Sequence, residues 1–215
     1  MQIETNGILI NIKPFSERDA IAHIFTVDNG VMVGMLRGAV VARKNKPLIG
    51  QYGAVSWNAR LDSQLGVFHW DAEKNLSAPL MMNNDLLKIM NAMFALIYSL
   101  LPERESYEHL YNETFELLSK LSGCKNPYDL YLGWEIDLLR DLGYALDMTK
   151  CSGCGTTDNL CYLSPKTGRA VCVDCGAPYM DRLYKLPLNL DVTKRFIGNV
   201  CEVQGLEIPI ARKII

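Results

Sequence analysis

Cys151-Ser-Gly-Cys154 and Cys172-Val-Asp-Cys175 are two pairs of cysteines, each with two residues between its thiols. The 17 residues between the pairs fall within the usual spacing of a four-cysteine zinc site. Two intervening residues allow both thiolates of a pair to reach one tetrahedral ion at about 2.3 Å. The pattern therefore predicts a four-cysteine zinc ribbon over residues 151–176.

The segment between the cysteine pairs has the pattern of a hairpin. Cys161-Tyr-Leu163 and Arg169-Ala-Val171 flank the Ser164-Pro-Lys-Thr-Gly168 segment, which is rich in turn residues. A hairpin with one cysteine pair near each end is the build of a zinc ribbon. Gly155 and Gly176 each follow the second cysteine of a pair, where we expect the chain to turn so that backbone N–H groups approach sulfur.

Other interpretations of these cysteines remain open. Iron also binds four thiolates, and Cys161 inside the ribbon is an alternative fourth ligand. A redox C-x-x-C pair opens a helix in a thioredoxin-like unit, which this sequence does not predict. A catalytic zinc has about three protein ligands and an open position, but His23, His69 and His109 share no ligand spacing with the cysteines. We therefore predict one structural zinc ion.

The first 80 residues predict a small β-barrel. Five short runs are rich in β-branched and aromatic residues and are bounded by turn residues, among them Asn29-Gly30, a strong hairpin signal. The runs cover residues 7–12, 21–27, 31–36, 53–61 and 65–70, with a turn at Asp62-Ser63-Gln64 before the last. Five such strands fit an oligonucleotide-binding (OB) barrel, and an SH3-like barrel is the alternative.

Residues 81–150 predict three helices with apolar stripes that belong to a core. The helices cover residues 84–101, 106–121 and 127–142, and they end at Pro102, Gly123 and Gly143. A further short helix is predicted near residues 192–200. The predicted fold is therefore an α+β multidomain protein. Its domains are an OB barrel at 1–80, a helical domain at 81–150 continued by 177–215, and the ribbon at 151–176.

The charge of the chain is unevenly distributed. Its 215 residues carry a net charge of -2, which excludes a uniformly basic DNA-coating protein. Residues 81–150 hold six basic and eleven acidic side chains, whereas no acid occurs between Asp28 and Asp62. That acid-free interval contains five cations, which are Arg37, Arg43, Lys44, Lys46 and Arg60. They predict a phosphate-binding surface, and a solvated lysine-rich loop is the alternative.

Several function classes find no support in the sequence. It contains no Walker A loop, G-x-G-x-x-G, H-E-x-x-H or G-x-S-x-G motif, and its acidic runs fit solvated helix faces. We therefore predict that the protein is not an enzyme. Charges interrupt the first twenty residues, and the longest uncharged run, residues 89–102, is too short to span a bilayer. We expect a cytoplasmic protein without a membrane partner.

The order of several local motifs resembles the bacterial recombination mediator family RecO. A glycine-led strand runs into Lys13-Pro-Phe-Ser-Glu-Arg-Asp19, and Phe25-Thr26 precedes the hairpin Gly30. Arg37-Gly38-Ala39 is followed by the downstream basic residues. Leu138-Leu-Arg-Asp-Leu-Gly-Tyr144 precedes the first cysteine pair, and Pro209-Ile-Ala-Arg212 lies near the C-terminus. The resemblance covers nearly the whole chain, and it depends on the order of the motifs more than on any one of them.

The resemblance implies a DNA repair and recombination mediator in the bacterial cytoplasm, associated with the nucleoid. Such proteins bind single- and double-stranded DNA, anneal complementary strands and work with RecR. They engage the C-terminal tail of single-strand-binding protein and help to load RecA. We expect the five cations to contact phosphates, and Tyr52, Trp57 or Trp70 either to stack bases or to fill the barrel core. The tail is expected among the helices, near Lys120, Lys125 or Arg140.

Two other functions compete with this interpretation. A barrel-and-ribbon scaffold for protein interactions, or an RNA-binding module, would use the acidic middle segment or prefer folded RNA over single-stranded DNA. A metal-assisted hydrolase would show zinc-dependent turnover that is lost when the four cysteines are replaced. Strand annealing on DNA coated with single-strand-binding protein distinguishes the mediator from both.

Overall fold

The computed structural model describes residues 1–61 and 64–215, and the turn predicted at Asp62-Ser63 lies outside the described residues. The chain forms two compact units. The first comprises residues 1–128 and 209–215, and the second comprises residues 129–208. The boundary at 128/129 therefore falls inside the helical segment predicted from the sequence.

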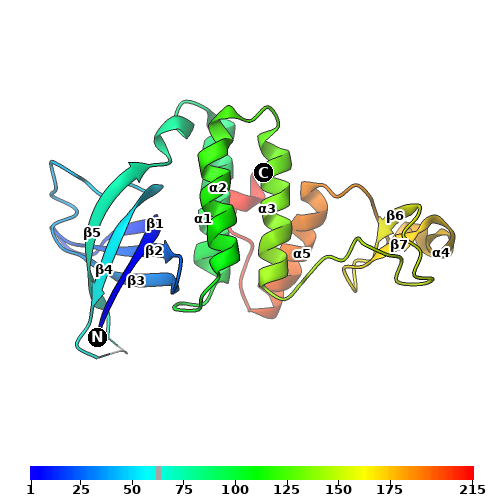
Figure 1. The fold of residues 1–215 in the computed structure, drawn as a ribbon, viewed down its shortest axis with the longest axis horizontal. Helices are drawn as coiled ribbons and strands as arrows, with labels where there is room; N and C mark the ends of the chain where they lie inside the picture. The colour runs from blue at the N-terminus through cyan, green and yellow to red at the C-terminus, as the bar shows by residue number, and fades with distance from the viewer. Residues whose placement is uncertain (62–63) are drawn as a thin grey trace. The chain divides into compact units, whose positions relative to one another are not determined.

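Five strands of the first unit close into a barrel (Figure 1). They are β1 (Gln2–Pro14), β2 (Ala20–Thr26), β3 (Gly30–Leu36), β4 (Gln51–Asn58) and β5 (Gly66–Asn75). Their order around the barrel is β1-β2-β3-β5-β4, and β1 pairs with β4 to close it. Only β3 and β5 are parallel among these pairs. The prediction of a five-stranded, OB-like barrel is confirmed.

Strand β1 is longer than predicted because it serves two neighbours. Its first half pairs with β4, from Gln2 opposite Asn58 to Ile8 opposite Tyr52. Its second half pairs with β2 as far as Pro14 opposite Ala20, and the register shifts between Leu9 and Asn11. Such an irregularity bends a strand and increases its twist, so one strand turns from one neighbour to the other.

The barrel interior is filled by the alternating apolar side chains that the sequence predicts. Val55 and Trp57 on β4 point inward and are buried, and the Trp57 indole N–H donates to the carbonyl oxygen of Val33 at 3.0 Å. Leu61, which the same alternation places in the predicted strand, is exposed because β4 ends at Asn58. Gly66 leaves the space that the Trp57 ring occupies, since a Cβ there would lie 2.1 Å from the ring.

The turn of the β2–β3 hairpin requires glycine at residue 30, and this requirement can be tested through the stability of the protein. Gly30 has φ +60°, and a Cβ there would lie 1.8 Å from the backbone oxygen of Glu105. Gly30→Ala should therefore lower the free energy of unfolding by about 2–4 kcal/mol, from backbone strain and overlap together. Chemical denaturation measures this.

Gly38→Ala is the matched control. Gly38 also has positive φ, at +70°, but a Cβ added there would have no atom within 4 Å. Its substitution should cost only the left-handed strain of about 1 kcal/mol. Equal losses of stability for the two variants would contradict the close packing of Gly30 on Glu105.

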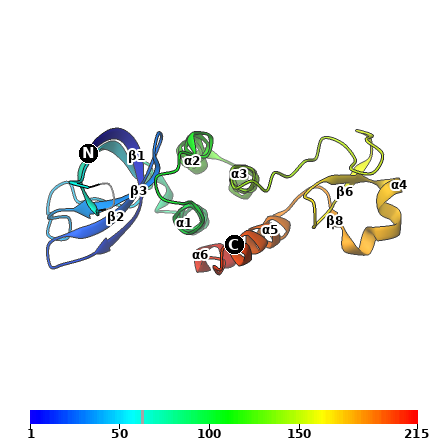
Figure 2. The same cartoon turned by 90° about the horizontal axis from the view of Figure 1, so that it is seen from below.

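Helices α1 (Asn84–Leu100) and α2 (Glu108–Lys120) complete most of the first unit and lie beside the barrel (Figures 1 and 2). Asn83 caps α1 by accepting hydrogen bonds from the N–H groups of Asp85 and Leu86. Short 3₁₀ turns at Ala78–Leu80 and Leu121–Gly123 precede α1 and follow α2. The C-terminal α6 (Ile210–Lys213) packs against α1.

The second unit combines two long helices with the ribbon. Its elements are α3 (Pro127–Asp141), β6 (Leu160–Leu163), β7 (Ala170–Cys172), α4 (Val173–Gly176), a 3₁₀ helix (Ala177–Arg182), β8 (Tyr184–Lys185) and α5 (Leu190–Val203). The strands form one sheet in the order β7-β6-β8. Strand β8 lies beyond the predicted end of the ribbon at Gly176.

The ends of α3 and α5 have local causes in the sequence. Gly143 has φ +85°, its N–H bonds the carbonyl of Arg140, and the Tyr144 N–H bonds that of Leu139. This pair of bonds is the glycine stop predicted for α3. Helix α5 begins earlier than predicted because Asn189 caps it, accepting from the N–H groups of Asp191 and Val192. Between the two helices, the fully buried Thr193 hydroxyl donates to the buried Glu135 carboxylate.

Candidate metal centre and basic surface

The four predicted cysteines converge on one point of the second unit. The sulfur atoms of Cys151, Cys154, Cys172 and Cys175 all lie within 4.8 Å of one another. Cys151 and Cys172 are buried, Cys175 is half-buried and Cys154 is exposed. Cys161 is on β6 and does not belong to this group. The residues therefore offer the four-thiolate donor set that a tetrahedral metal ion requires.

Two chain turns position the thiols. The first turn folds back at Gly155, whose φ is +78° and whose N–H bonds the carbonyl oxygen of Cys151 at 2.9 Å. In the second, Cys172 occupies the N-cap position of the short helix α4, which carries Cys175. The N–H groups of Gly153 and Cys172 each donate to the Cys151 sulfur at 3.3 Å. This confirms the expectation that backbone N–H groups approach sulfur.

Gly176 has a different role from the one predicted. It does not turn the chain, because it is the last residue of the helix α4. A Cβ at this position would lie 2.5 Å from the ring of Tyr162. Glycine is required here so that α4 can lie close to β6.

The thiols of the cysteine cluster differ in how tightly they hold their protons. The pKa of Cys151 is lowered to about 6, first because the Cys172 N–H donates to its sulfur, with backbone donation from Cys154 and Gly153 adding to this. The pKa of Cys175 is raised to about 12, first by its hydrogen bond with the thiol of Cys172 and then by those with Cys154 and Cys151. A divalent ion that binds four thiolates must displace the protons that the thiols hold.

Metal retention should therefore depend on pH. Protons compete with the ion for the thiolates, so the affinity for metal should rise with pH and fall as the thiols are protonated. We expect dialysis against a competing chelator to strip the metal at about pH 5 and to leave it bound at about pH 8. Metal analysis of the dialysed protein measures this. Retention that does not change over this range would contradict a four-thiolate site.

The predicted cations lie on the barrel and are exposed. Four of the five, which are Arg37, Arg43, Lys44 and Lys46, belong to the connection from β3 to β4, residues 37–50, here called the basic loop. The basic loop contains no acidic residue. The fifth cation, Arg60, follows the end of β4, whereas the basic loop precedes its start. Arg60 instead lies toward the start of the basic loop, because Asn58 at the end of β4 pairs with Val67 of β5, and Val67 also pairs with Met35 near the end of β3.

Both ends of the basic loop are fixed to the barrel. At its start, Ala39 is buried in the barrel core, and the Val40 N–H bonds the carbonyl oxygen of Arg18 at 3.0 Å. At its end, the Gly50 N–H bonds the carbonyl oxygen of Leu9 at 2.8 Å. Arg43, Lys44 and Lys46 lie between these two anchors, which restrict the loop and lower the entropy lost when it binds a ligand.

The aromatic residues proposed to stack bases are largely committed to packing. Trp57 is fully buried, so its core alternative holds and stacking on DNA is excluded. Trp70 is half-buried and packs against the barrel core. Tyr52 is half-buried, and its ring meets Phe115 of α2 edge-on with 5.1 Å between ring centroids.

The three cations expected as alternatives near a partner's tail differ in their surroundings. Lys120 pairs with Glu116 on α2, and Arg140 pairs with Asp137 on α3 at 2.8 Å. Lys125 is exposed. Lys120 and Lys125 belong to the first unit and Arg140 to the second.

In the described part of the chain, no helix is both long enough and apolar enough to cross a membrane.

The chain belongs to a class of proteins in which a closed OB-like barrel with a basic loop is followed by helices and a four-cysteine ribbon. These parts occur in the order that the sequence motifs predict. Family models agree with this. Residues 1–70 match "Recombination protein O N terminal", and residues 85–204 match "Recombination protein O C terminal". The chain belongs to the RecO family of DNA repair proteins, so the resemblance seen in the sequence is confirmed.

Curated relatives support the same assignment over most of the chain. "DNA repair protein RecO" of Jannaschia sp. (strain CCS1) is 36% identical over 192 residues, covering 88% of this chain and 77% of the relative. The protein of that name from Ruegeria sp. (strain TM1040) is 37% identical, with 87% and 78% covered. That of Cereibacter sphaeroides (strain ATCC 17025) is 33% identical, with 96% and 93% covered.

Proposed function

We propose that this protein is a recombination mediator without catalytic activity. It binds single- and double-stranded DNA, anneals complementary strands and, with RecR, helps to load RecA onto DNA coated by single-strand-binding protein. The observation that carries this proposal is the basic loop: four exposed cations, without an acidic residue among them, on a loop whose two ends are hydrogen-bonded to the barrel. Such an arrangement neutralises phosphates without reading sequence, and annealing requires this because any pair of complementary strands must be accepted.

The ribbon has a structural role in this proposal. Four cysteines would saturate a zinc ion, so the metal would have no open position for a substrate. Bound zinc supplies folding energy to the second unit. Iron in the same four-thiolate set remains an outcome that metal analysis distinguishes. A closed site of this kind supports the absence of catalysis by the metal.

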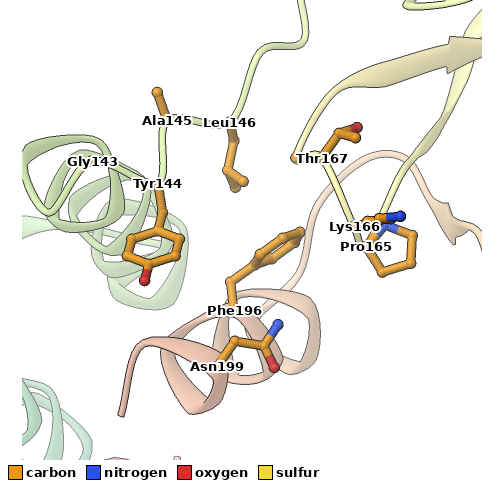
Figure 3. Close-up of a pocket in the computed structure, with 10 residues that line it drawn as sticks. Gly143, Tyr144, Ala145, Leu146, Pro165, Lys166, Thr167, Phe196 and Asn199 are labelled. Atoms are coloured by element: carbon orange, nitrogen blue, oxygen red, sulfur yellow. The ribbon is translucent and has the colours of Figure 1, made fainter. Parts of the chain in front are cut away.

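The second unit offers one hollow suited to the apolar, acidic tail of single-strand-binding protein. Its volume is about 210 Å³, and its lining comes from the turn after α3, the tip of the β6–β7 hairpin and α5. Figure 3 shows Tyr144, Leu146 and Phe196 facing the hollow, with Lys166 across from them. Apolar walls with one cation nearby match a tail that carries both apolar groups and carboxylates.

Strand annealing tests the proposal. Complementary strands coated with single-strand-binding protein should anneal faster when this protein is added, and the acceleration should be lost with single-strand-binding protein that lacks its tail. Annealing on uncoated strands, measured in parallel, separates DNA binding from tail recognition. No acceleration on either substrate, together with preferential binding of folded RNA, would favour the scaffold or RNA-binding alternative.

A further inference from the structure

The turn between β1 and β2 presents one aromatic ring to solvent. The side chain of Phe15 is 63% exposed, and no other phenylalanine in the described residues is among the exposed large apolar side chains. The turn that carries it is well ordered by hydrogen bonds. The N–H of Phe15 bonds the carbonyl oxygen of Asp19 at 2.9 Å, and the Asp19 N–H bonds the Ser16 hydroxyl at 3.0 Å. The ring is thus held outward on a fixed backbone.

Two hydrogen bonds join this turn to the basic loop. The Gly38 N–H donates to the Asp19 carboxylate at 2.8 Å, and the Val40 N–H donates to the carbonyl oxygen of Arg18 at 3.0 Å. Arg37 precedes Gly38 in the chain and is exposed, as is Arg18. Phe15 and these two arginines therefore belong to one continuous surface at this end of the barrel.

The charge of this surface remains favourable to phosphate. The turn contributes two acids, Glu17 and Asp19. Glu17 is exposed, but the Asp19 carboxylate is half-buried and accepts the Gly38 N–H. Against them stand Arg18 and the four cations of the basic loop. An aromatic face bordered by cations is the arrangement that binds unpaired bases while the cations hold the backbone.

We propose that Phe15 stacks on an unpaired base of a DNA strand whose phosphates contact Arg18 and the basic loop. This inference rests on the proposed function and adds a means of preferring single strands, because a base inside a duplex has no free face. Phe15 thus takes the role that the sequence suggested for Tyr52, Trp57 or Trp70, of which Trp57 is buried and the other two are half-buried. The only sequence signal for it is an aromatic residue directly after the strand-ending Pro14.

Substitution of Phe15 should separate the two kinds of DNA. Phe15→Leu keeps an apolar side chain but removes the aromatic face, so binding to single-stranded DNA should weaken about tenfold, as loss of one stacked base predicts. Binding to duplex DNA should be unchanged, and Phe15→Trp should bind single strands at least as well as the wild type. The matched control is Tyr179→Leu, which removes an exposed aromatic ring from the second unit and should alter neither.

An oligonucleotide with abasic sites gives a second readout. The wild type should lose affinity for it to the level of Phe15→Leu, whereas Phe15→Leu should bind abasic and normal strands equally. Wild-type affinity for single strands in Phe15→Leu, or an equal loss for both kinds of DNA, would overturn the stacking role and leave the proposed function standing. Failure of the wild type to bind any DNA would instead refute the proposed function, and this inference with it.

Discussion

Cys151→Ser is expected to release the metal and unfold the ribbon. Binding of a structural zinc ion contributes on the order of 10 kcal/mol to the folding of small zinc domains. Without it, the ribbon has a small core. Its buried apolar residues are Cys151, Leu163, Ala170, Val171 and Cys172, with partly buried Leu160 and Tyr162 packed against the cluster of Cys151, Val171 and Cys172. A core of this size does not keep a domain folded without a bound metal or a covalent cross-link.

Metal analysis and limited proteolysis measure this effect. The wild type should contain about one zinc ion per chain, and Cys151→Ser should contain little or none and be cleaved rapidly within residues 151–185. Cys161→Ser is the matched control, because Cys161 lies in the same ribbon but outside the cluster. It should retain zinc, and loss of zinc in this variant would show that Cys161 is a ligand after all.

Arg43→Glu combined with Lys44→Glu should weaken binding to every DNA sequence. Engagement of four or five phosphates predicts a slope of about -3 for the logarithm of affinity against that of salt concentration on single strands. Reversal of two cations removes two contacts and adds repulsion, so the slope should become shallower by one to two units. At about 0.15 M salt, this should reduce affinity by at least tenfold.

Fluorescence anisotropy over a series of salt concentrations measures both quantities. Arg182→Glu combined with Lys185→Glu is the charge-matched control, because both residues are exposed on the second unit, away from the basic loop in sequence. It should leave the salt slope unchanged. Equal affinities of the wild type and the basic-loop variant would contradict the phosphate-binding role of that loop, while an equal loss in the control would indicate a general effect of charge.

The charge-reversed basic-loop variant and Phe15→Leu together separate the role of the basic loop from that of Phe15. Loss of phosphate contacts should affect single and double strands alike, because both present phosphates. Loss of the Phe15 ring should affect single strands alone. A combined variant should show the sum of the two effects if the cations and the ring act on different parts of the nucleotide.

Some features were predictable because the information for them is local. The two C-x-x-C pairs predicted the cluster, since the spacing within each pair and the turn between them restrict where the thiols can lie. Asn29-Gly30 predicted the hairpin, and Gly143 predicted the end of α3. Both turns need a backbone with positive φ, which glycine adopts at Gly30 and Gly143. Apolar alternation likewise predicted that Val55 lies inside the barrel.

Other features depend on contacts that sequence spacing does not reveal. The length of β1 follows from its pairing with two strands. Glycine is required at residue 176 because the Tyr162 ring leaves no room for a Cβ there. Four of the five cations in the acid-free interval share one loop, and pairing through β5 places Arg60, just past the end of β4, toward the start of that loop. Trp57 and Phe15 were both aromatic residues near strands, and only closure of the barrel decided which of them is buried.

The sequence by itself determined the four-cysteine cluster, the five-strand barrel, the helices and the family, because periodicity, turn residues and cysteine spacing act over short stretches of chain. The tertiary structure alone decided which cations share a loop and which aromatic ring faces solvent. These depend on strand register and barrel closure, where small changes in pairing exchange the inner and outer faces of a strand. The acid-free interval predicts a phosphate-binding surface, and the fold places four of its five cations on one loop that is hydrogen-bonded to the turn of Phe15.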